Sequence, residues 1–237
     1  MNEATPTWPE LRWDEAVDRV SKCVFRIYAG VSAGTGFVIS IGHDAKTGNS
    51  YATVATAWHV IKPLIGTSED LKIESVDGKT VFSSAADQVG FYPLGGPQFD
   101  TGLIVLRTGV PLVNVSELLP LPPPDSILAR GTEIGWLGFP GITWPELCFF
   151  HGHISGYLND PPIYLVDGVA INGVSGGPAF DSRVHLIGLV SAYLPNRIDP
   201  STTLPGLMAL VPISAIRYWM ESGLGAKVLS KSDLANG

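Results

Sequence analysis

A serine in a glycine-rich loop is the side chain of this sequence best suited to attack an acyl group. Ser175 lies in the run Ile-Asn-Gly-Val-Ser-Gly-Gly-Pro-Ala-Phe at 171–180, with Gly173 before it and Gly176 and Gly177 after it. Acyl transfer needs an accessible nucleophile and backbone N–H groups aimed at the oxyanion that forms. Because Gly173 lacks a Cβ, its N–H can turn into a concave loop. A simple turn between two strands is the alternative, but the rest of the chain favours an oxyanion hole formed by the N–H groups of Gly173 and Ser175.

A serine hydroxyl also needs a general base and a group that orients the base, usually His and Asp. His59 follows the run Tyr-Ala-Thr-Val-Ala-Thr-Ala-Trp at 51–58, which is typical of a β-strand that ends beside the histidine. Asp100 comes directly before an apolar strand-like run at 101–106, where its carboxylate can be buried and held. The candidate catalytic residues are therefore His59, Asp100 and Ser175.

Four separated motifs occur in an order known from one family of peptidases. They are Gly-Thr-Gly-Phe-Val-Ile at 34–39 with Thr-Ala-Trp-His-Val at 56–60, Asp100 with its apolar strand, Ile-Gly-Trp-Leu-Gly-Phe-Pro-Gly at 134–141, and the loop of Ser175. Over roughly residues 23 to 213 the chain resembles the chymotrypsin-fold serine peptidases, most closely the compact bacterial trypsin-like and HtrA-like group. The resemblance implies a triad in a cleft between two β-barrels and a serine endopeptidase that acts on polypeptides through an acyl-enzyme. We expect no PDZ domain after residue 223.

Two residues beside the predicted site depart from the family pattern. Trp58 stands where a small residue usually precedes the base, and Val174 stands where Asp or Asn usually precedes the nucleophile. In secreted digestive-type members that Asp binds a new N-terminus released by cleavage, so we expect no activation step of that kind here. The departures leave open whether the serine loop is formed before substrate binds.

The resemblance also places a pocket for the residue that precedes the scissile bond. Val169, six residues before the nucleophile, corresponds to the base of this pocket. Since this base is apolar and carries no acid, we expect cleavage after a small or aliphatic residue rather than after Lys or Arg. The predicted substrate contacts are Val169, Ala170, Asn172, Ser191, Ala192 and Tyr193.

Composition and patterning predict an all-β fold. The 237 residues include 27 Gly and 19 Pro, and 16% are charged, which is typical of sheets joined by tight turns. Helical spacing predicts an N-terminal helix at Trp13–Val20, and a C-terminal helix is expected at Ile213–Ser222. Strand-like runs lie at 24–28, 34–41, 51–56, 71–76, 79–83, 88–92, 101–107, 131–138, 147–156, 162–167, 178–181, 184–193 and 206–212. Together with the resemblance, this predicts two six-stranded antiparallel Greek-key β-barrels (chymotrypsin-like) with short N- and C-terminal helices.

A proline-rich segment divides the chain into two halves. Leu-Pro-Leu-Pro-Pro-Pro-Asp at 119–125 fits neither a helix nor a central strand. The predicted domains are 1–118 with the N-terminal helix and first barrel, 119–126 as a linker, 127–223 with the second barrel and C-terminal helix, and 224–237 as a flexible tail. Since His59 and Asp100 fall in the first half and Ser175 in the second, neither barrel alone carries the whole site.

Charge, hydropathy and cysteine content argue against several other classes of protein. The net charge of −7 and the lack of a Lys/Arg cluster argue against a nucleic-acid partner. No apolar run reaches the ~18 residues of a membrane span, and the first residues lack the basic and apolar regions of a secretory signal. Cys23 and Cys148 lie in apolar strand-like runs and are expected to be buried free thiols. We therefore expect a cytoplasmic protein with no membrane partner, and the resemblance implies that it acts on a polypeptide.

Two other functions are alternatives to a peptidase. The pattern Gly-Val-Ser-Gly-Gly also fits the nucleophile elbow of α/β-hydrolases. Those enzymes need alternating helices and a histidine after the serine, and here only His185 follows. The second alternative is a catalytically silent peptidase fold that binds peptides or acts as a scaffold.

Other polar residues near the candidate site are more typical of structural positions. Asp167 and Asp181 flank the serine loop and could replace Asp100 as the orienting group, but both positions are typical of turns. His151 and His153 alternate in a strand-like run, a spacing more typical of a strand face than of a metal site. We therefore expect no metal and no cofactor.

Overall fold

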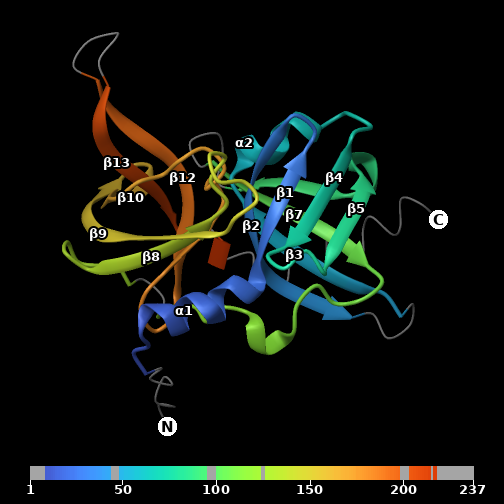
Figure 1. Ribbon diagram of the computed structural model, residues 1–237, viewed down its shortest axis with the longest axis horizontal. Coiled ribbons are helices and arrows are strands. Elements are labelled where there is room, and N and C mark those ends of the chain that lie inside the picture. Colours follow the sequence, from blue (N-terminus) through green and yellow to red (C-terminus); the bar gives the residue numbers. More distant parts are fainter. Residues whose placement is uncertain are drawn as a thin grey trace.

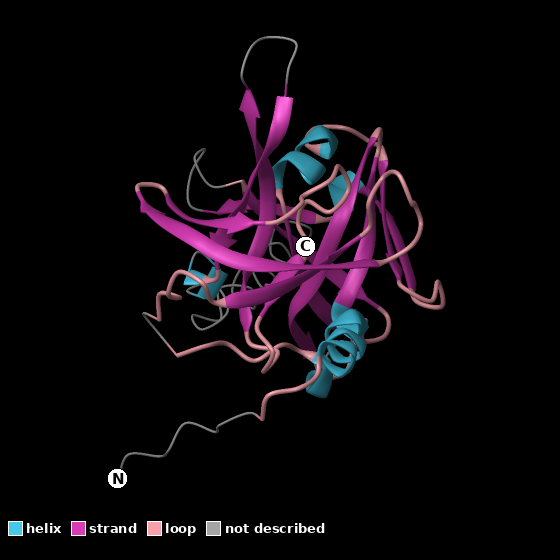
Figure 2. Cartoon of the chain, turned by 60° about the vertical axis from the view of Figure 1, so that its left-hand side comes forward, coloured by secondary structure: helices cyan, strands magenta, loops and turns pink. Residues whose placement is uncertain are grey.

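Two antiparallel β-sheets, one from each half of the chain, form the body of the protein (Figure 1). The structure is a computed structural model and describes residues 9–43, 48–94, 100–123, 126–197, 203–214 and 216–217. Strands dominate both halves, and the helices are short and lie at the margins (Figure 2). Within this described part of the chain, no helix is long and apolar enough to cross a membrane.

The first sheet has seven strands in the order β5-β4-β1-β2-β3-β7-β6. Its strands are β1 (Val24–Ala29), β2 (Ser32–His43), β3 (Ser50–Thr56), β4 (Asp70–Ser75), β5 (Val81–Ala85), β6 (Gly90–Leu94) and β7 (Thr101–Thr108). Short helical segments precede, connect and follow them: η1 (Ser21–Cys23), α2 (Trp58–Ile61), η2 (Lys62–Leu64), η3 (Ala86–Gln88) and η4 (Val115–Glu117). Because β3 pairs antiparallel with β7, the segment that follows β3 and the segment that precedes β7 lie side by side at the same end of these two strands.

The second sheet closes into a six-stranded barrel in the order β10-β13-β12-β11-β8-β9. Its strands are β8 (Glu133–Gly138), β9 (Cys148–Asn159), β10 (Pro162–Asp167), β11 (Pro178–Phe180), β12 (Leu186–Arg197) and β13 (Thr203–Pro212). The ends of β12 and β13 extend beyond the barrel toward the upper left of Figure 1. The serine loop connects β10 to β11 and therefore belongs to this barrel.

The all-β prediction is confirmed, and the second half forms the predicted six-stranded barrel. The first sheet differs, because it has seven strands and does not close on itself within the described residues. In this sheet β1 lies between β2 and β4 and pairs with both. The helix α1 (Trp13–Val20) matches the predicted N-terminal helix. Most of the predicted C-terminal helix at 213–222 lies outside the described residues, and the domain boundaries stay a prediction.

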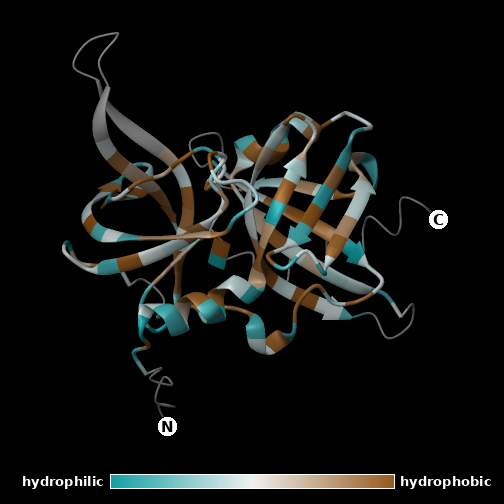
Figure 3. Ribbon diagram, in the orientation of Figure 1, coloured by the Kyte–Doolittle hydropathy of each residue, from teal (hydrophilic) through white to brown (hydrophobic). Residues whose placement is uncertain are grey.

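Alternation of more and less buried side chains explains how β4 packs. In β4, Leu71 and Ile73 are fully buried, whereas Lys72 between them is only half-buried. Figure 3 shows hydrophobic and hydrophilic residues alternating along this strand. Because successive side chains of a strand point to opposite faces, this pattern turns one face of β4 toward the core.

The helix α1 packs against both halves of the chain (Figure 1). Ala16 and Val20 on this helix are fully buried in the core that includes the first sheet. The centroid of the Trp13 ring lies 5.4 Å from that of Phe149 in β9 and 6.0 Å from that of Phe180 in β11. One face of the helix therefore links the two sheets.

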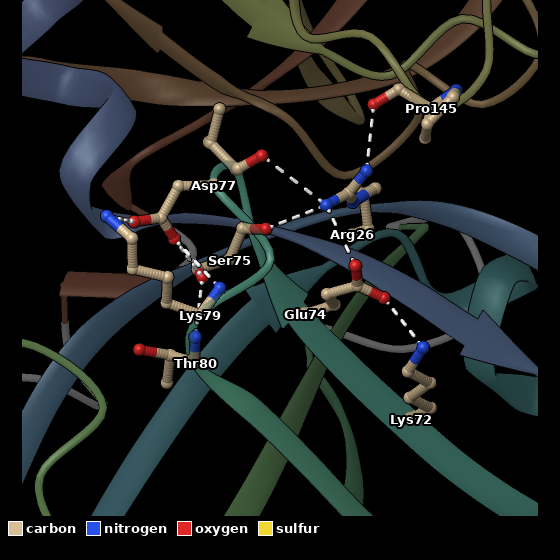
Figure 4. A network of polar contacts seen from close by, with 9 residues as sticks. Arg26, Lys72, Glu74, Ser75, Asp77, Lys79, Thr80 and Pro145 are labelled. Carbon is tan, nitrogen blue, oxygen red and sulfur yellow. Dashed lines mark hydrogen bonds and ion pairs between the residues drawn. The ribbon is translucent and has the colours of Figure 1, made fainter.

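A buried arginine connects β1 to a loop of the second half (Figure 4). The side chain of Arg26 is 7% exposed, and its Nη2 donates to Glu74 Oε1 at 3.0 Å. Its Nη1 donates to the carbonyl of Pro145 at 3.1 Å, across the boundary between the sheets. Lys72 Nζ lies 2.7 Å from the other carboxylate oxygen of Glu74. This network therefore holds the loop at 139–147 against the first sheet.

Replacement of Glu74 by alanine is expected to lower the free energy of unfolding by about 3 kcal/mol, because it leaves a buried guanidinium without its ionic partner. Chemical denaturation at neutral pH measures this change. Glu10→Ala is the matched control, since the ion pair of Glu10 with Arg183 is exposed and is worth less than about 1 kcal/mol. Equal losses in the two variants would contradict the prediction.

The same prediction has a pH dependence, because the pKa of Glu74 lies below its ordinary value of 4.5. The main cause is the hydrogen bond from Lys72, and the charge of Arg26 acts in the same direction. A carboxylate with a lowered pKa stabilises the fold above its ordinary pKa, and this contribution is lost as the pH falls through the lowered value. The loss caused by Glu74→Ala should therefore shrink when the pH is taken below 4.5.

The two cysteines are free thiols, as expected, but only one of them is buried. Burial raises the pKa of the Cys23 thiol to about 12. Cys148 is half-buried, so the expectation of burial is wrong for this residue. The physical reason is its position at the first residue of β9, where the strand emerges from the loop at 139–147.

Candidate active site

The pairing of β3 with β7 brings His59 and Asp100 together. Thr56, the last residue of β3, pairs with Gly102 near the start of β7. His59 lies in α2 just after β3, and Asp100 lies just before β7. The backbone N–H of Trp58 donates to the Asp100 carbonyl at 3.2 Å and fixes the two segments side by side.

The Asp100 carboxylate holds His59 through both its ring and its backbone. Oδ2 of Asp100 lies 2.5 Å from Nδ1 of His59, and Oδ1 accepts the backbone N–H of His59 at 2.9 Å. A proton on Nδ1 donates to this carboxylate, which leaves Nε2 as the free acceptor of the neutral ring. Since the His59 side chain is 53% exposed, other molecules can reach it.

A serine hydroxyl also bonds to the Asp100 carboxylate. Ser191 in β12 is buried, and its Oγ donates to Asp100 Oδ2 at 3.1 Å. This bond joins the second barrel to an acid of the first sheet. The family resemblance predicts Ser191 in the wall of the substrate pocket, and no local pattern of the sequence indicates its bond to Asp100.

The serine loop lies against β2 of the first sheet. The Ser175 carbonyl accepts the N–H of Thr35 at 3.0 Å, and the N–H of Gly176 donates to the Val190 carbonyl in β12 at 2.7 Å. Gly176 has a φ of +87°, and a Cβ at this position would clash with Thr35 and Thr56. The loop can approach the first sheet this closely because glycine follows the serine.

Gly34 lies where the serine loop meets the histidine helix. A Cβ at Gly34 would come 2.7 Å from the Val60 side chain and 3.3 Å from the Ser175 carbonyl oxygen. Val60 follows His59 in α2, so the structure brings the three predicted catalytic residues to one region between the sheets. Ser175 Oγ makes no hydrogen bond with a residue that the structure describes.

Three successive carbonyls of the serine loop each accept a hydrogen bond. The pairs are Asn172 with the N–H of Gly141 at 2.7 Å, Gly173 with Thr35 Oγ1 at 2.7 Å, and Val174 with the N–H of Gly177 at 3.0 Å. In a trans peptide the N–H points opposite to the C=O. The N–H groups of Gly173 and Ser175 therefore point away from these donors, and neither donates to a described residue.

The two residues that depart from the family pattern both pack into the fold. Val174 is fully buried in the core of the second barrel, and a Cβ at Gly138 would come 2.7 Å from its Cγ1. Trp58 is half-buried, and its ring lies against Gly102 of β7. Val174 therefore anchors the serine loop by burying an apolar side chain. A buried Asp at this position would need a partner for its charge.

The predicted substrate contacts come from the segment before the serine loop and from β12. Val169 is 54% exposed, Asn172 is exposed, and Ala170 is half-buried against the core of the second barrel. Ala192 in β12 is exposed. Tyr193 belongs to β12, but its side chain lies outside the described residues. The role of these residues in substrate binding stays a prediction.

The two acids considered as alternatives to Asp100 pair with other histidines. Asp181 Oδ2 lies 2.9 Å from Nδ1 of His185, and Asp167 Oδ1 lies 3.6 Å from Nδ1 of His153. Asp100 is therefore the acid that holds His59. Among the residues that the structure describes, no group of three or more His, Cys, Asp or Glu could hold a metal ion.

The family of the chain follows from its sequence. A family model described as the trypsin-like peptidase domain matches residues 34–189, which include all three predicted catalytic residues. The chain therefore belongs to the trypsin-like peptidases, as its motifs predicted. A search of curated protein sequences finds no match.

Three solved protease structures have folds similar to that of this chain. A serine endoprotease from Yersinia pestis has a TM-score of 0.64 and 16% identity, over 92% of this chain and 67% of its own. The Rv3671c protease in an inactive form has a TM-score of 0.60 and 20% identity, over 92% and 96%. A serine-to-alanine mutant of Rv3671c from M. tuberculosis, also inactive, has a TM-score of 0.61 and 19% identity, over 94% and 96%. The fold is chymotrypsin-like.

Thr35 is the residue of this region that sequence reasoning missed. It was visible only as the centre of Gly-Thr-Gly, and glycines within a strand are a signal that another backbone comes close. Its side-chain partners Phe139 and Gly173 lie 104 and 138 residues away in the sequence. A local pattern therefore reveals the close approach without revealing what approaches.

Proposed function

We propose that this protein is a serine endopeptidase in which His59, Asp100 and Ser175 form a catalytic triad. The observation that carries the proposal is the distance of 2.5 Å between Asp100 Oδ2 and His59 Nδ1, in a member of the trypsin-like peptidases. The orientation of the serine loop supports an oxyanion hole made by the N–H groups of Gly173 and Ser175.

The proposed reaction is a two-step acyl transfer. Ser175 Oγ attacks the carbonyl carbon of the scissile peptide bond while Nε2 of His59 accepts its proton. Asp100 stabilises the imidazolium, and the oxyanion of the tetrahedral intermediate accepts hydrogen bonds from Gly173 and Ser175. His59 then protonates the leaving amine, and the acyl-enzyme forms. Water then gives a proton to His59 and attacks the acyl carbon. Collapse of this second intermediate breaks the bond to Ser175 Oγ, which takes the proton back from His59 as the carboxylic acid product leaves.

We further propose cleavage after a small or aliphatic residue. The support for this specificity is the apolar, exposed side chain of Val169 at the position where an acid would select Lys or Arg. A peptide library that varies the residue before the scissile bond measures the preference.

A fluorophosphonate probe tests the proposed function, because it bonds covalently to a serine that a base activates. Folded wild-type protein should be labelled, and Ser175→Ala should not be. Ser155→Ala is the matched control, since Ser155 is an exposed serine of β9 that has no part in the proposed mechanism, and this variant should keep the label. If folded wild-type protein takes no label, the protein is instead a catalytically silent peptidase fold that binds peptides or acts as a scaffold.

A further inference from the structure

We infer that Thr35 is a positioning residue that holds the serine loop on both sides of the oxyanion-hole peptides from the first sheet, an inference that rests on the proposed function. Thr35 lies in β2 and is fully buried. It makes no contact with a reacting atom in the proposed mechanism. Its four hydrogen bonds instead connect β2 to three other segments: the end of β3, the serine loop and the loop at 139–147.

The Thr35 hydroxyl uses both its donor and its acceptor across the boundary between the sheets. Oγ1 donates to the carbonyl of Gly173 at 2.7 Å and accepts the N–H of Phe139 at 3.0 Å. Gly173 belongs to the serine loop, and Phe139 follows β8. One hydroxyl of the first sheet therefore ties together two segments of the second barrel.

The backbone of Thr35 fixes the hydroxyl in place. Its N–H donates to the Ser175 carbonyl at 3.0 Å, and its own carbonyl accepts Thr56 Oγ1 at 2.7 Å. Thr56 ends β3, just before the helix that carries His59. Thr35 thus bonds both to the end of β3, which leads into His59, and to the serine loop.

The bond to Phe139 acts on the oxyanion hole by a second route. Gly141, two residues after Phe139, donates its N–H to the Asn172 carbonyl at 2.7 Å. The peptide between Asn172 and Gly173 supplies the first N–H of the proposed hole, so holding its carbonyl sets the direction of that N–H. Thr35 therefore fixes the peptide after Gly173 directly and the peptide before it through the loop at 139–147.

This arrangement explains how the loop can be formed although Val174 carries no charge. The bracing comes from a buried neutral hydroxyl, which is present as soon as the two sheets pack together. A buried hydroxyl with both hydrogen bonds satisfied also disfavours rearrangement, because breaking them leaves buried polar groups without partners. We therefore expect the oxyanion hole to be formed without an activating cleavage.

Thr35→Val tests the inference, because valine has nearly the shape of threonine and makes neither hydrogen bond. We expect the rate of fluorophosphonate labelling, and kcat on a peptide that the wild type cleaves, to fall on the order of 10- to 100-fold, less than the loss of a whole oxyanion donor. KM should change little, since the ground-state carbonyl depends less on the hole than the oxyanion does. Thr35→Ser keeps the hydroxyl and should recover most of the rate.

Thr108→Val is the matched control. Thr108 is also a buried threonine of the first sheet, and its Oγ1 donates to the Ser50 carbonyl at 3.2 Å, at the opposite end of β3 from Thr56. This variant should lose stability without losing kcat. Equal labelling rates for Thr35→Val and Thr108→Val, in a wild-type protein that is labelled, would overturn the role of Thr35 alone. Absence of labelling in the wild type would overturn the proposed function instead.

Folding of the variants is followed by thermal unfolding. If Thr35→Val does not fold, Thr35→Ala provides the same comparison, because its smaller side chain avoids any steric conflict. If neither variant folds while Thr35→Ser does, the hydroxyl is required for the fold itself, and the inference of a positioning role is wrong.

Discussion

Replacement of His59 by alanine is expected to lower kcat for peptide hydrolysis about 10⁶-fold, because Ser175 then lacks a base and the leaving amine lacks an acid. The remaining rate would come from binding and from the oxyanion hole. Steady-state kinetics on a peptide selected with the wild type measures the loss, and circular dichroism shows whether the variant is folded.

His185→Ala is the matched control for this loss. His185 also pairs with an aspartate, since its Nδ1 lies 2.9 Å from Asp181 Oδ2. If the protein were an α/β-hydrolase, His185 would be its catalytic histidine, because it follows Ser175 in the sequence. We expect this variant to keep its activity. Loss of activity in His185→Ala with retention in His59→Ala would reverse the assignment of the base.

Asp100→Asn is expected to lower kcat about 10⁴-fold while the fold is retained. The side-chain amide of asparagine can donate to Nδ1 of His59 at the position where the carboxylate accepts. The ring then carries its proton on Nε2 and cannot accept one from Ser175. Nuclear magnetic resonance of the ring nitrogens reports this change of tautomer directly, independently of the rate.

Asp181→Asn changes a comparable histidine–aspartate pair outside the proposed site and should leave kcat unaltered. Ser191→Ala removes one hydrogen bond to Asp100 and should cause a loss much smaller than that of Asp100→Asn, because the carboxylate remains. If Asp100→Asn retained the wild-type rate, another group would have to orient His59.

The candidate catalytic residues could be predicted because each lies in a short local pattern. His59 follows a β-type run, Asp100 precedes one, and Ser175 lies among glycines. Their convergence depends on the pairing of β3 with β7 and on the approach of the serine loop to β2. The family resemblance supplied that convergence, since periodicity alone predicts strands without predicting which strands pair.

The bracing of the site could not be predicted in the same way. Ser191 and Asp100 are 91 residues apart, and Thr35 and Gly173 are 138 residues apart, so these bonds exist only in the packed fold. The strand count of the first sheet was wrong for a related reason. Seven strand-like runs were visible in that half, but their assembly into an open sheet depends on pairing between strands distant in the sequence.

The contacts of α1 determine when this helix can finish packing during synthesis on the ribosome. This helix is synthesised before either sheet, yet the rings of Phe149 and Phe180 that its Trp13 contacts are added more than a hundred residues later. Because a nascent chain emerges from its N-terminus, the helix cannot complete its contacts until most of the second barrel has been made. His59 and Asp100 are thus synthesised well before Ser175, and the proposed triad cannot assemble until the serine loop has left the ribosome.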